Sequence, residues 1–227
     1  NKLVIYNGDL TGRIVPVNAD LWNEDELREV IQKGEDFLNI RFKESFTSEA
    51  IKASSGNVYI VQETCHRACN ESGIHKTVVG ERRLVGDGLN ARSLVAEIIQ
   101  EQSGRYNAFI TNYASGFQET ALAMHKWLLY PILTSSIDEL SKGLTYRSIR
   151  SKITSGHPQG KNLNPGNITQ ALKAVSSLQL SKSIQPIILD YDESNLTLHI
   201  VDKGFLIWLS MQDRNELLST VGLPEMT

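Results

Sequence analysis

The clearest pattern in the sequence is a helical repeat of apolar residues that follows Trp22. Asn23 is placed as an N-cap, and Glu26 stands at the position that completes a capping box. Glu24, Asp25 and Glu26 put negative charge at the positive end of the helix dipole. Apolar positions then recur with helical spacing at Leu27, Val30, Ile31, Gly34, Phe37 and Leu38. The pattern predicts an amphipathic helix that begins after Asn23 and runs through Leu38.

Two shorter helices are predicted next. The first starts at Thr47, because Phe46 and Ile51 are spaced as a hydrophobic staple, and it stops at the turn 54–56. Asn57 caps the other, whose apolar stripe is Val58, Val61, Cys65, Ala68 and Cys69. Three short helices joined by tight turns make a small bundle. Residues 72–90 contain four glycines among charged residues and predict a flexible surface loop.

The rest of the chain changes from helices to a mixed pattern. The elements predicted there are, in order, helices at 91–102, 117–133 and 146–153, a polar loop at 155–166, a helix capped by Asn167 with Gln170 in the capping-box position, strands at 187–191 and 196–201, and helices that start near Asp202 and Asp213. Helix, helix, hairpin, helix is the element order of a winged-helix domain. The predicted fold class is therefore mainly α (α+β).

Composition narrows the class of protein. The 227 residues suffice for one large or two small domains, and the net charge of −3 gives no overall attraction to nucleic acid or acidic membranes. No apolar run approaches the ~20 residues that a membrane span needs. Cys65 and Cys69 are expected to be buried apolar residues, because nothing indicates a disulfide framework. We expect a cytoplasmic protein with no membrane segment and no metal site.

Three stretches resemble parts of known ATPases. Residues 21–35, Leu-Trp-Asn-Glu-Asp-Glu-Leu through Ile-Gln-Lys-Gly-Glu, look like the start of the lid that follows the core in AAA and STAND-type P-loop proteins. Residues 54–58, Ser-Ser-Gly-Asn-Val, are similar to the turn before the third helix of such lids. Residues 164–172 together with 201–209 resemble the winged helix appended to many bacterial and archaeal ATPases of this kind.

The resemblance implies a domain order. Residues 1–18, which open on the strand-like run Leu3 to Tyr6, would be the tail end of an ATPase core, and the chain a fragment of a longer protein. Residues 19–72 would form the helical lid, residues 73–116 a linker and helix, and residues 117–227 the winged-helix domain with a two-stranded wing. The chain would hold no cofactor itself, since ATP and Mg²⁺ would bind to the upstream core. That core would be its main partner, and a homo-oligomer is left open.

Three residues are candidates for nucleotide contact by this resemblance. An arginine often follows the Gly-Asn turn in such lids and touches the γ-phosphate, but here Tyr59 lies near that place. Arg13 could reach the nucleotide of a neighbouring subunit, with a surface ion pair as its alternative. His199 on the second wing strand could contact bound ADP, as a winged-helix histidine does in some STAND proteins, or could simply be exposed.

The chain shows no nucleotide-binding loop or catalytic motif of its own. In the loop 156–162, three residues rather than four separate the glycines, and Asn162 replaces the hydroxyl that would hold magnesium. The five histidines are scattered without metal-ligand spacing. We therefore expect no catalytic residues and no metal ligands, and a parent protein that is an ATPase.

DNA binding is the alternative to this regulatory role. The candidate contacts are Arg147, Arg150, Lys152, Asn167, Gln170 and Lys173. A recognition helix from Asn167 to Leu180 would hold only one lysine, and the wing tip Asp192-Glu193 is acidic where a DNA-binding wing offers cations. Protein–protein packing is favoured for this domain. The competing hypothesis is a winged-helix DNA-binding regulator whose first helices serve dimerisation.

Overall fold

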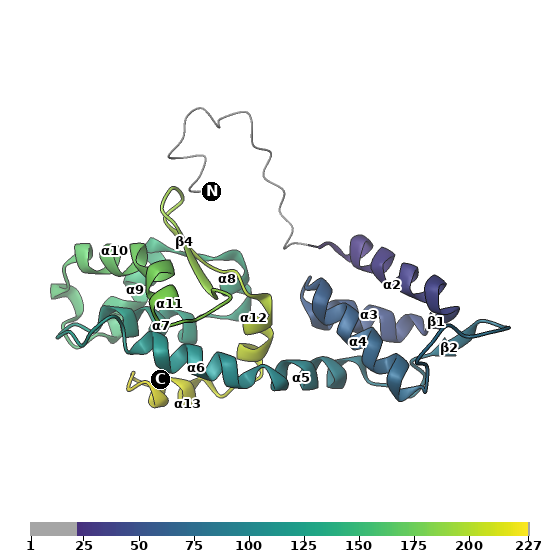
Figure 1. Ribbon diagram of the computed structural model, residues 1–227. Helices are drawn as coiled ribbons and strands as arrows, with labels where there is room; N and C mark the ends of the chain where they lie inside the picture. The colour runs from purple at the N-terminus through teal and green to yellow at the C-terminus, as the bar shows by residue number, and fades with distance from the viewer. Residues whose placement is uncertain (1–21, 227) are drawn as a thin grey trace.

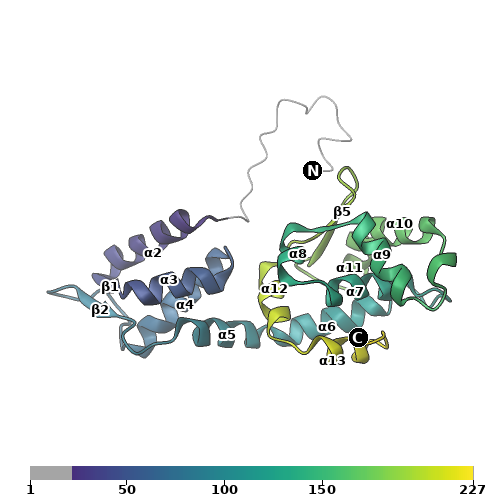
Figure 2. The same ribbon diagram turned by 180° about the vertical axis from the view of Figure 1, so that it is seen from behind.

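The computed structural model describes residues 22–226, which are mainly helical with one two-stranded and one three-stranded sheet. This confirms the predicted α+β class with helices dominant. Figure 1 shows two lobes joined along one side by two consecutive helices, and Figure 2 shows the same arrangement from behind. Residues 1–18, expected to be the end of an ATPase core, lie outside the described residues. No helix within residues 22–226 has the length and apolar character needed to cross a membrane.

The N-terminal lobe is built from three helices and a short parallel pair of strands. Its elements are α2 (Glu24–Leu38), β1 (Ile40–Phe42), α3 (Glu44–Ser54), α4 (Val58–Glu71) and β2 (Arg83–Val85). The capping box of α2 is present as predicted: Asn23 Oδ1 accepts from the Glu26 amide at 3.0 Å, and Glu26 accepts from the Asn23 amide at 2.8 Å. The Asn57 cap of α4 is also confirmed.

Two predictions for this lobe were wrong. The second helix begins at Glu44 rather than Thr47, so Phe46 lies inside it and stacks on Phe42 with ring centroids 5.4 Å apart. The segment 72–90 is not only a loop, because β2 lies within it and pairs in parallel with β1. Both differences arise from contacts with β1, a three-residue strand too short to be recognised from its own pattern.

Two helices connect the lobes. α5 (Ala91–Glu101) was predicted, whereas α6 (Ser103–Ala114) was missed. Ala91 and Leu94 of α5 belong to the apolar core of the N-terminal lobe, whereas Val95 and Ile99 belong to that of the C-terminal lobe. The lobes are thus joined by a helix buried in both. The helix predicted from Phe117 begins only at Met124.

The C-terminal lobe contains the larger core. Its elements after α6 are α7 (Met124–Thr134), α8 (Ile137–Lys142), β3 (Leu144–Thr145), α9 (Tyr146–Gly156), the 3₁₀ turn η2 (Gly160–Asn162), α10 (Pro165–Lys173), α11 (Val175–Ser181), β4 (Leu189–Asp192), β5 (Thr197–Ile200), α12 (Lys203–Ser210) and α13 (Arg214–Thr220). The sheet is antiparallel in the order β3-β5-β4. The predicted hairpin is therefore present, and β3, which was not predicted, extends it to three strands.

The helix expected to start at Asn167 also differs. Asn164 is its N-cap, with Pro165 in the first turn, and Asn167 lies inside α10. The helix is interrupted at Ala174, and α11 continues from Val175. The helices predicted to start near Asp202 and Asp213 are present as α12 and α13, and these two residues are their N-caps.

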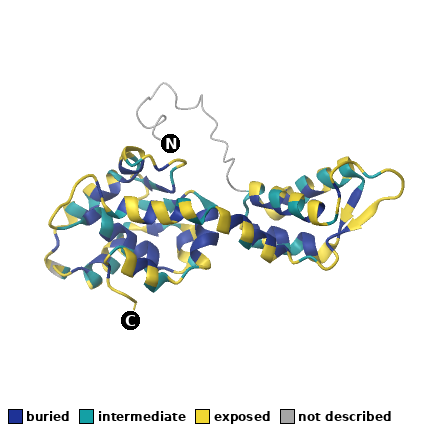
Figure 3. Cartoon of the chain, turned by 60° about the horizontal axis from the view of Figure 1, so that its bottom comes forward, coloured by how far each residue is buried: buried dark blue, intermediate teal, exposed yellow. Residues whose placement is uncertain are grey.

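Burial is uneven between the lobes (Figure 3). The stripe of α2 is only partly covered: Leu27 and Ile31 are buried, whereas Phe37 is 80% exposed. In the C-terminal lobe, Tyr106, Phe205 and Trp208 are fully buried and pack together with ring centroids 5.4–5.6 Å apart. The C-terminal lobe thus has the more complete core.

Candidate functional site

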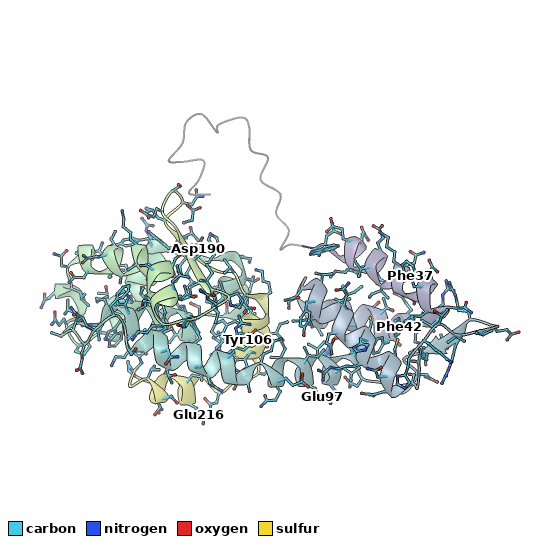
Figure 4. The ribbon with its side chains drawn as sticks, in the orientation of Figure 1. Phe37, Phe42, Glu97, Tyr106, Asp190 and Glu216 are labelled. Atoms are coloured by element: carbon cyan, nitrogen blue, oxygen red, sulfur yellow. The ribbon has the colours of Figure 1, made fainter. Side chains whose placement is uncertain are left out.

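A cleft of about 690 Å³ lies where the two lobes meet. The N-terminal lobe contributes Trp22 and the start of α4. The C-terminal lobe contributes the junction of α5 and α6, the chain leading into β4, and the turn between β5 and α12. The lining residues are Trp22, Asn57, Val58, Tyr59, Gln102, Arg105, Pro186, Ile187, Asp190, Val201, Asp202 and Lys203. Figure 4 labels Asp190 in this lining and Tyr106, which contacts its wall.

A polar network stabilises the wall formed by the C-terminal lobe. Asp202 forms a salt bridge with Arg105, and it caps α12 by accepting from the Gly204 amide at 2.9 Å. The Tyr106 hydroxyl lies 3.1 Å from Gln102 Oε1 and 3.4 Å from Asp202 Oδ1. The side chains of Arg105 and Asp202 are 33% and 14% exposed, so this ion pair is partly shielded from water. The charge of Arg105 is therefore neutralised within the protein.

Aromatic side chains lie behind this network. The Arg105 guanidinium is 5.1 Å from the ring centroid of Tyr106, a distance typical of a cation–π contact. Burial, together with the nearby charge of Asp202, raises the pKa of the Tyr106 phenol, so this hydroxyl stays protonated at neutral pH. Because Tyr106 packs on Phe205 and Trp208, the wall is continuous with the core. We expect it to be rigid.

The remaining polar groups of the cleft include one cation, one phenol and one carboxylate. Lys203 is half-buried and forms no ion pair with any residue between 22 and 226. Tyr59 is 55% exposed and presents its ring at the start of α4. Asp190 accepts from the Ser176 hydroxyl at 3.1 Å, which fixes its carboxylate. Within the described part of the chain, no group of three or more His, Cys, Asp or Glu side chains could hold a metal ion.

The nucleotide-contact candidates are placed differently. Tyr59 lines the cleft. His199 does not line the cleft. Its imidazole packs directly over Gly143, since a Cβ added to this glycine would lie 2.7 Å from His199 Nδ1. Arg13 lies outside the described residues. Of the three, the structure brings only Tyr59 to the interface between the lobes.

The DNA-contact candidates do not form one surface. Arg147 and Arg150 are exposed on α9, whereas the Lys152 ammonium donates to the Thr134 carbonyl at 3.1 Å on a half-buried side. Lys173 is exposed on α10 and pairs with Glu193 of the turn between β4 and β5 at 2.9 Å. Asn167 and Gln170 line a separate groove of about 400 Å³ with residues 117–125.

An apolar groove of about 520 Å³ separates α2 from α4. Val30, Gly34 and Leu38 form its α2 side, and Val61, Cys65 and Cys69 form part of its α4 side. The partly covered stripe of α2 thus borders open space on the face that carries Phe37, which Figure 4 labels on the outside of the lobe. Burial raises the pKa of the Cys65 thiol to about 12, so the thiol is protonated at neutral pH.

Sequence reasoning missed most of the cleft. Asp202 was predicted only as a helix start, and Arg105 was not singled out, because their contact spans 97 residues and leaves no local pattern. A signal did exist for α6, whose buried side chains Tyr106, Phe109, Ile110 and Tyr113 have helical spacing.

Comparisons with known proteins add no assignment to this geometry. No protein-family model matches the sequence, and neither a curated protein nor a solved structure shows a significant match to it.

Proposed function

We propose that this chain is the regulatory and assembly module of a P-loop ATPase, formed by a helical lid and a winged-helix domain, with no catalytic activity of its own. The C-terminal lobe supports the winged-helix part of this proposal. From α8 to β5 the chain forms a helix, the short strand β3, helix α9, the 3₁₀ turn η2, the consecutive helices α10 and α11 separated at Ala174, and a hairpin. The strand order is β3-β5-β4. That order is the one expected for a winged helix whose wing is the β4–β5 hairpin.

The observation that carries the proposal is the position of Trp22 on the rim of the cleft between the lobes. Trp22, directly before the N-cap of α2, lines this cleft together with residues of both lobes. An ATPase core formed by residues before position 19 would therefore lie beside the start of α4 and the start of α12 together. Such a core could contact the lid and the winged helix at once, so a change in its nucleotide state would alter the contacts of both.

The chemistry of the cleft suggests how the module would respond. Arg105 is held by Asp202, and Tyr59 stands near the position where lids of this kind often carry an arginine. Lys203 is therefore the cleft cation that remains able to pair with an anionic group of the core or its nucleotide. ATP and Mg²⁺ would be held by the core, and the protein would act in the cytoplasm.

The open half of the α2 stripe offers a second contact with the core. Leu27 and Ile31 are covered within the chain, but Val30, Gly34 and Phe37 face open space. Burying apolar area contributes roughly 25 cal/mol per Å², so covering a mostly exposed phenylalanine gives a useful contact free energy. We expect this face to pack on the core when the lid closes.

The alternative of a base-reading DNA regulator has less support. The one lysine of α10 is paired with Glu193 of the wing, so it is not directed at a base edge. Gln170, the other exposed polar candidate of α10, lies against the groove beside residues 117–125. These contacts favour a protein-packing role for this helix.

The test is to express the complete natural polypeptide that contains this sequence and to measure ATP hydrolysis. We expect hydrolysis by the parent polypeptide and none by residues 1–227 alone. The double variant Tyr59→Ala/Lys203→Ala should change the hydrolysis rate of the parent severalfold. The control Phe117→Ala/Leu180→Ala removes two exposed apolar side chains of the C-terminal lobe and should leave the rate unchanged.

Three results would overturn the proposal. One is hydrolysis of ATP by residues 1–227 alone. Another is a parent polypeptide that contains no P-loop and binds no nucleotide. The third is an ATPase whose rate changes equally in the cleft variant and the control variant, because the cleft would then have no particular role.

A further inference from the structure

Positive charge is concentrated in one segment of this acidic chain. Residues 140–189 contain no aspartate or glutamate, and the last acidic residue before them is Glu139 and the first after them Asp190. The basic residues within the segment are Lys142, Arg147, Arg150, Lys152, Lys161, Lys173 and Lys182. Since the whole chain has 23 basic and 26 acidic residues, removing these seven leaves the rest with a net charge of −10. The segregation is a property of the sequence and does not depend on the role proposed above.

The acid-free segment forms one region of the C-terminal lobe. It includes β3, α9, η2, α10 and α11. In Figures 1 and 2, α9 and α10 lie toward the end of this lobe that is remote from α2. Helices α9 and α10, which carry Arg147, Arg150, Lys152 and Lys173, therefore lie away from α2 and the N-terminal lobe.

Two exposed cations of this region lie on α9. Arg147 and Arg150 are three residues apart, which places them on the same helical face. Both are exposed, and neither forms an ion pair with another residue of the described chain. By contrast, Lys142 pairs with Asp138 at 2.7 Å and Lys173 with Glu193 at 2.9 Å. The two arginines thus carry positive charge that the protein leaves uncompensated.

The surroundings of the two arginines are rich in hydroxyl groups. Arg147 and Arg150 border a groove of about 570 Å³ between α9 and the segment leading into α10, and its other lining residues are Tyr146, Ser151, Thr154, Ser155 and Leu163. The Tyr146 hydroxyl donates to the Pro165 carbonyl at 3.2 Å, which holds that segment against α9. The groove is therefore bordered by guanidinium and hydroxyl groups on a rigid helix.

This chemistry matches phosphate oxygens better than a protein partner. Arginine and small hydroxyl side chains are the usual donors to the DNA backbone, and protein–DNA interfaces are polar and positively charged. Protein–protein interface cores are instead enriched in aromatic residues and depleted of charge. Binding of single strands needs exposed aromatic rings on which bases stack. The ring available here, Tyr146, is half-buried and its hydroxyl is engaged.

We propose that the face of α9 bearing Arg147 and Arg150, with the adjoining hydroxyl groups, binds the phosphate backbone of duplex DNA without reading its sequence. The contact is electrostatic, so it weakens as salt displaces the DNA. Each neutralised phosphate contributes about −0.9 to the slope of log affinity against log salt. Two arginine contacts therefore give a slope of about −2.

The test is fluorescence anisotropy of the complete chain with a labelled duplex of about 20 base pairs at 50 and 150 mM salt, a length that spans two turns of helix. We expect binding at 50 mM salt, a slope of about −2 or steeper, and equal affinity for a duplex of shuffled sequence. The variant Arg147→Gln/Arg150→Gln should bind at least about tenfold more weakly, with a slope about 2 units shallower than that of the wild type. The matched control Arg82→Gln/Arg92→Gln removes two exposed arginines from the N-terminal lobe and should bind like the wild type.

The opposite results are equally clear. Absence of binding at 50 mM salt, or equal weakening in both double variants, would overturn the proposal. Tighter binding to the single strand than to the duplex would exclude the duplex backbone as the ligand. Displacement by poly-glutamate at the same concentration of charge would show that the face attracts any polyanion, and a strong preference for one duplex sequence would show base reading. Circular dichroism of each variant verifies that the fold is retained.

Discussion

Replacing the buried Gln179 should destabilise the protein much more than replacing a polar side chain on its surface. Gln179 is fully buried on α11. Its Oε1 accepts from the amides of Ile188 and Leu189 at 2.8 and 3.0 Å, and its Nε2 donates to the carbonyls of Leu189 and Val175 at 2.7 and 3.1 Å. All four hydrogen bonds that a glutamine amide can make are present. The side chain therefore forms hydrogen bonds with backbone groups on the edge of β4 that does not pair with β5.

The substitution Gln179→Met keeps the approximate volume and removes every polar atom. It leaves the Ile188 amide and both backbone groups of Leu189 without the partner they have in the native protein. A buried polar group that loses its partner costs about 1–3 kcal/mol. Three such groups, reduced by local relaxation, give an expected loss of about 3–5 kcal/mol in the free energy of unfolding. For a chain of this length, this corresponds to a fall in Tm of about 6–20 °C.

Urea unfolding followed by far-UV circular dichroism measures this loss. The fluorescence of Trp127 and Trp208, both buried in the C-terminal lobe, provides a second probe of the lobe that contains Gln179. The control Ser177→Ala changes an exposed neighbour on the same helix and should stay within about 0.5 kcal/mol of the wild type. If Gln179→Met is as stable as this control, the four hydrogen bonds do not have the role assigned to them here.

Two further predictions concern titratable groups. Burial lowers the pKa of His125 below its ordinary value of 6.5, and its ring packs edge-on against Phe117 and Tyr113. The unfolded chain therefore binds more protons near pH 6, so stability should be complete above pH 6.5 and fall as the pH drops toward the native pKa. His125→Phe should reduce the change in the urea midpoint between pH 7.5 and 5.0. An unchanged pH dependence would contradict this prediction. Burial raises the pKa of Cys65 to about 12 and also raises the pKa of Cys69. Neither thiol should therefore react with iodoacetamide at pH 8 until urea is added. Rapid labelling of the native protein would contradict this prediction.

Local sequence signals predicted the elements that carry their own end signals. The α2 helix follows from Asn23 and Glu26, whose side chains and amides exchange hydrogen bonds within four residues. The same holds for the Asn57 cap of α4 and the Asp202 cap of α12. Such caps act over one turn of helix, so no knowledge of the rest of the fold is needed to find them. The β4–β5 hairpin was predicted for a similar reason, since its two strands are joined by a short polar turn.

Other elements depend on partners far along the chain. β1 and β2 are three residues each and exist because they pair with one another across some forty residues. α6 was missed although its buried side chains have helical spacing, because Gly104 lies at its start and the helix is secured by packing on residues near position 205. α3 begins at Glu44 rather than at Thr47 because its first turn includes Phe46, which stacks on Phe42 of β1.

By itself, the sequence determined the helical class, the starts of the well-capped helices and the segregation of positive charge, because propensity, capping and composition are properties of neighbouring residues. Only the tertiary structure decided which polar groups face one another. The salt bridge of Arg105 with Asp202 neutralises a cation that the sequence alone leaves free, and that of Lys173 with Glu193 does the same on α10. The free energy with which a charge interacts depends on the distance to its partner and on its access to water, and folding sets both quantities.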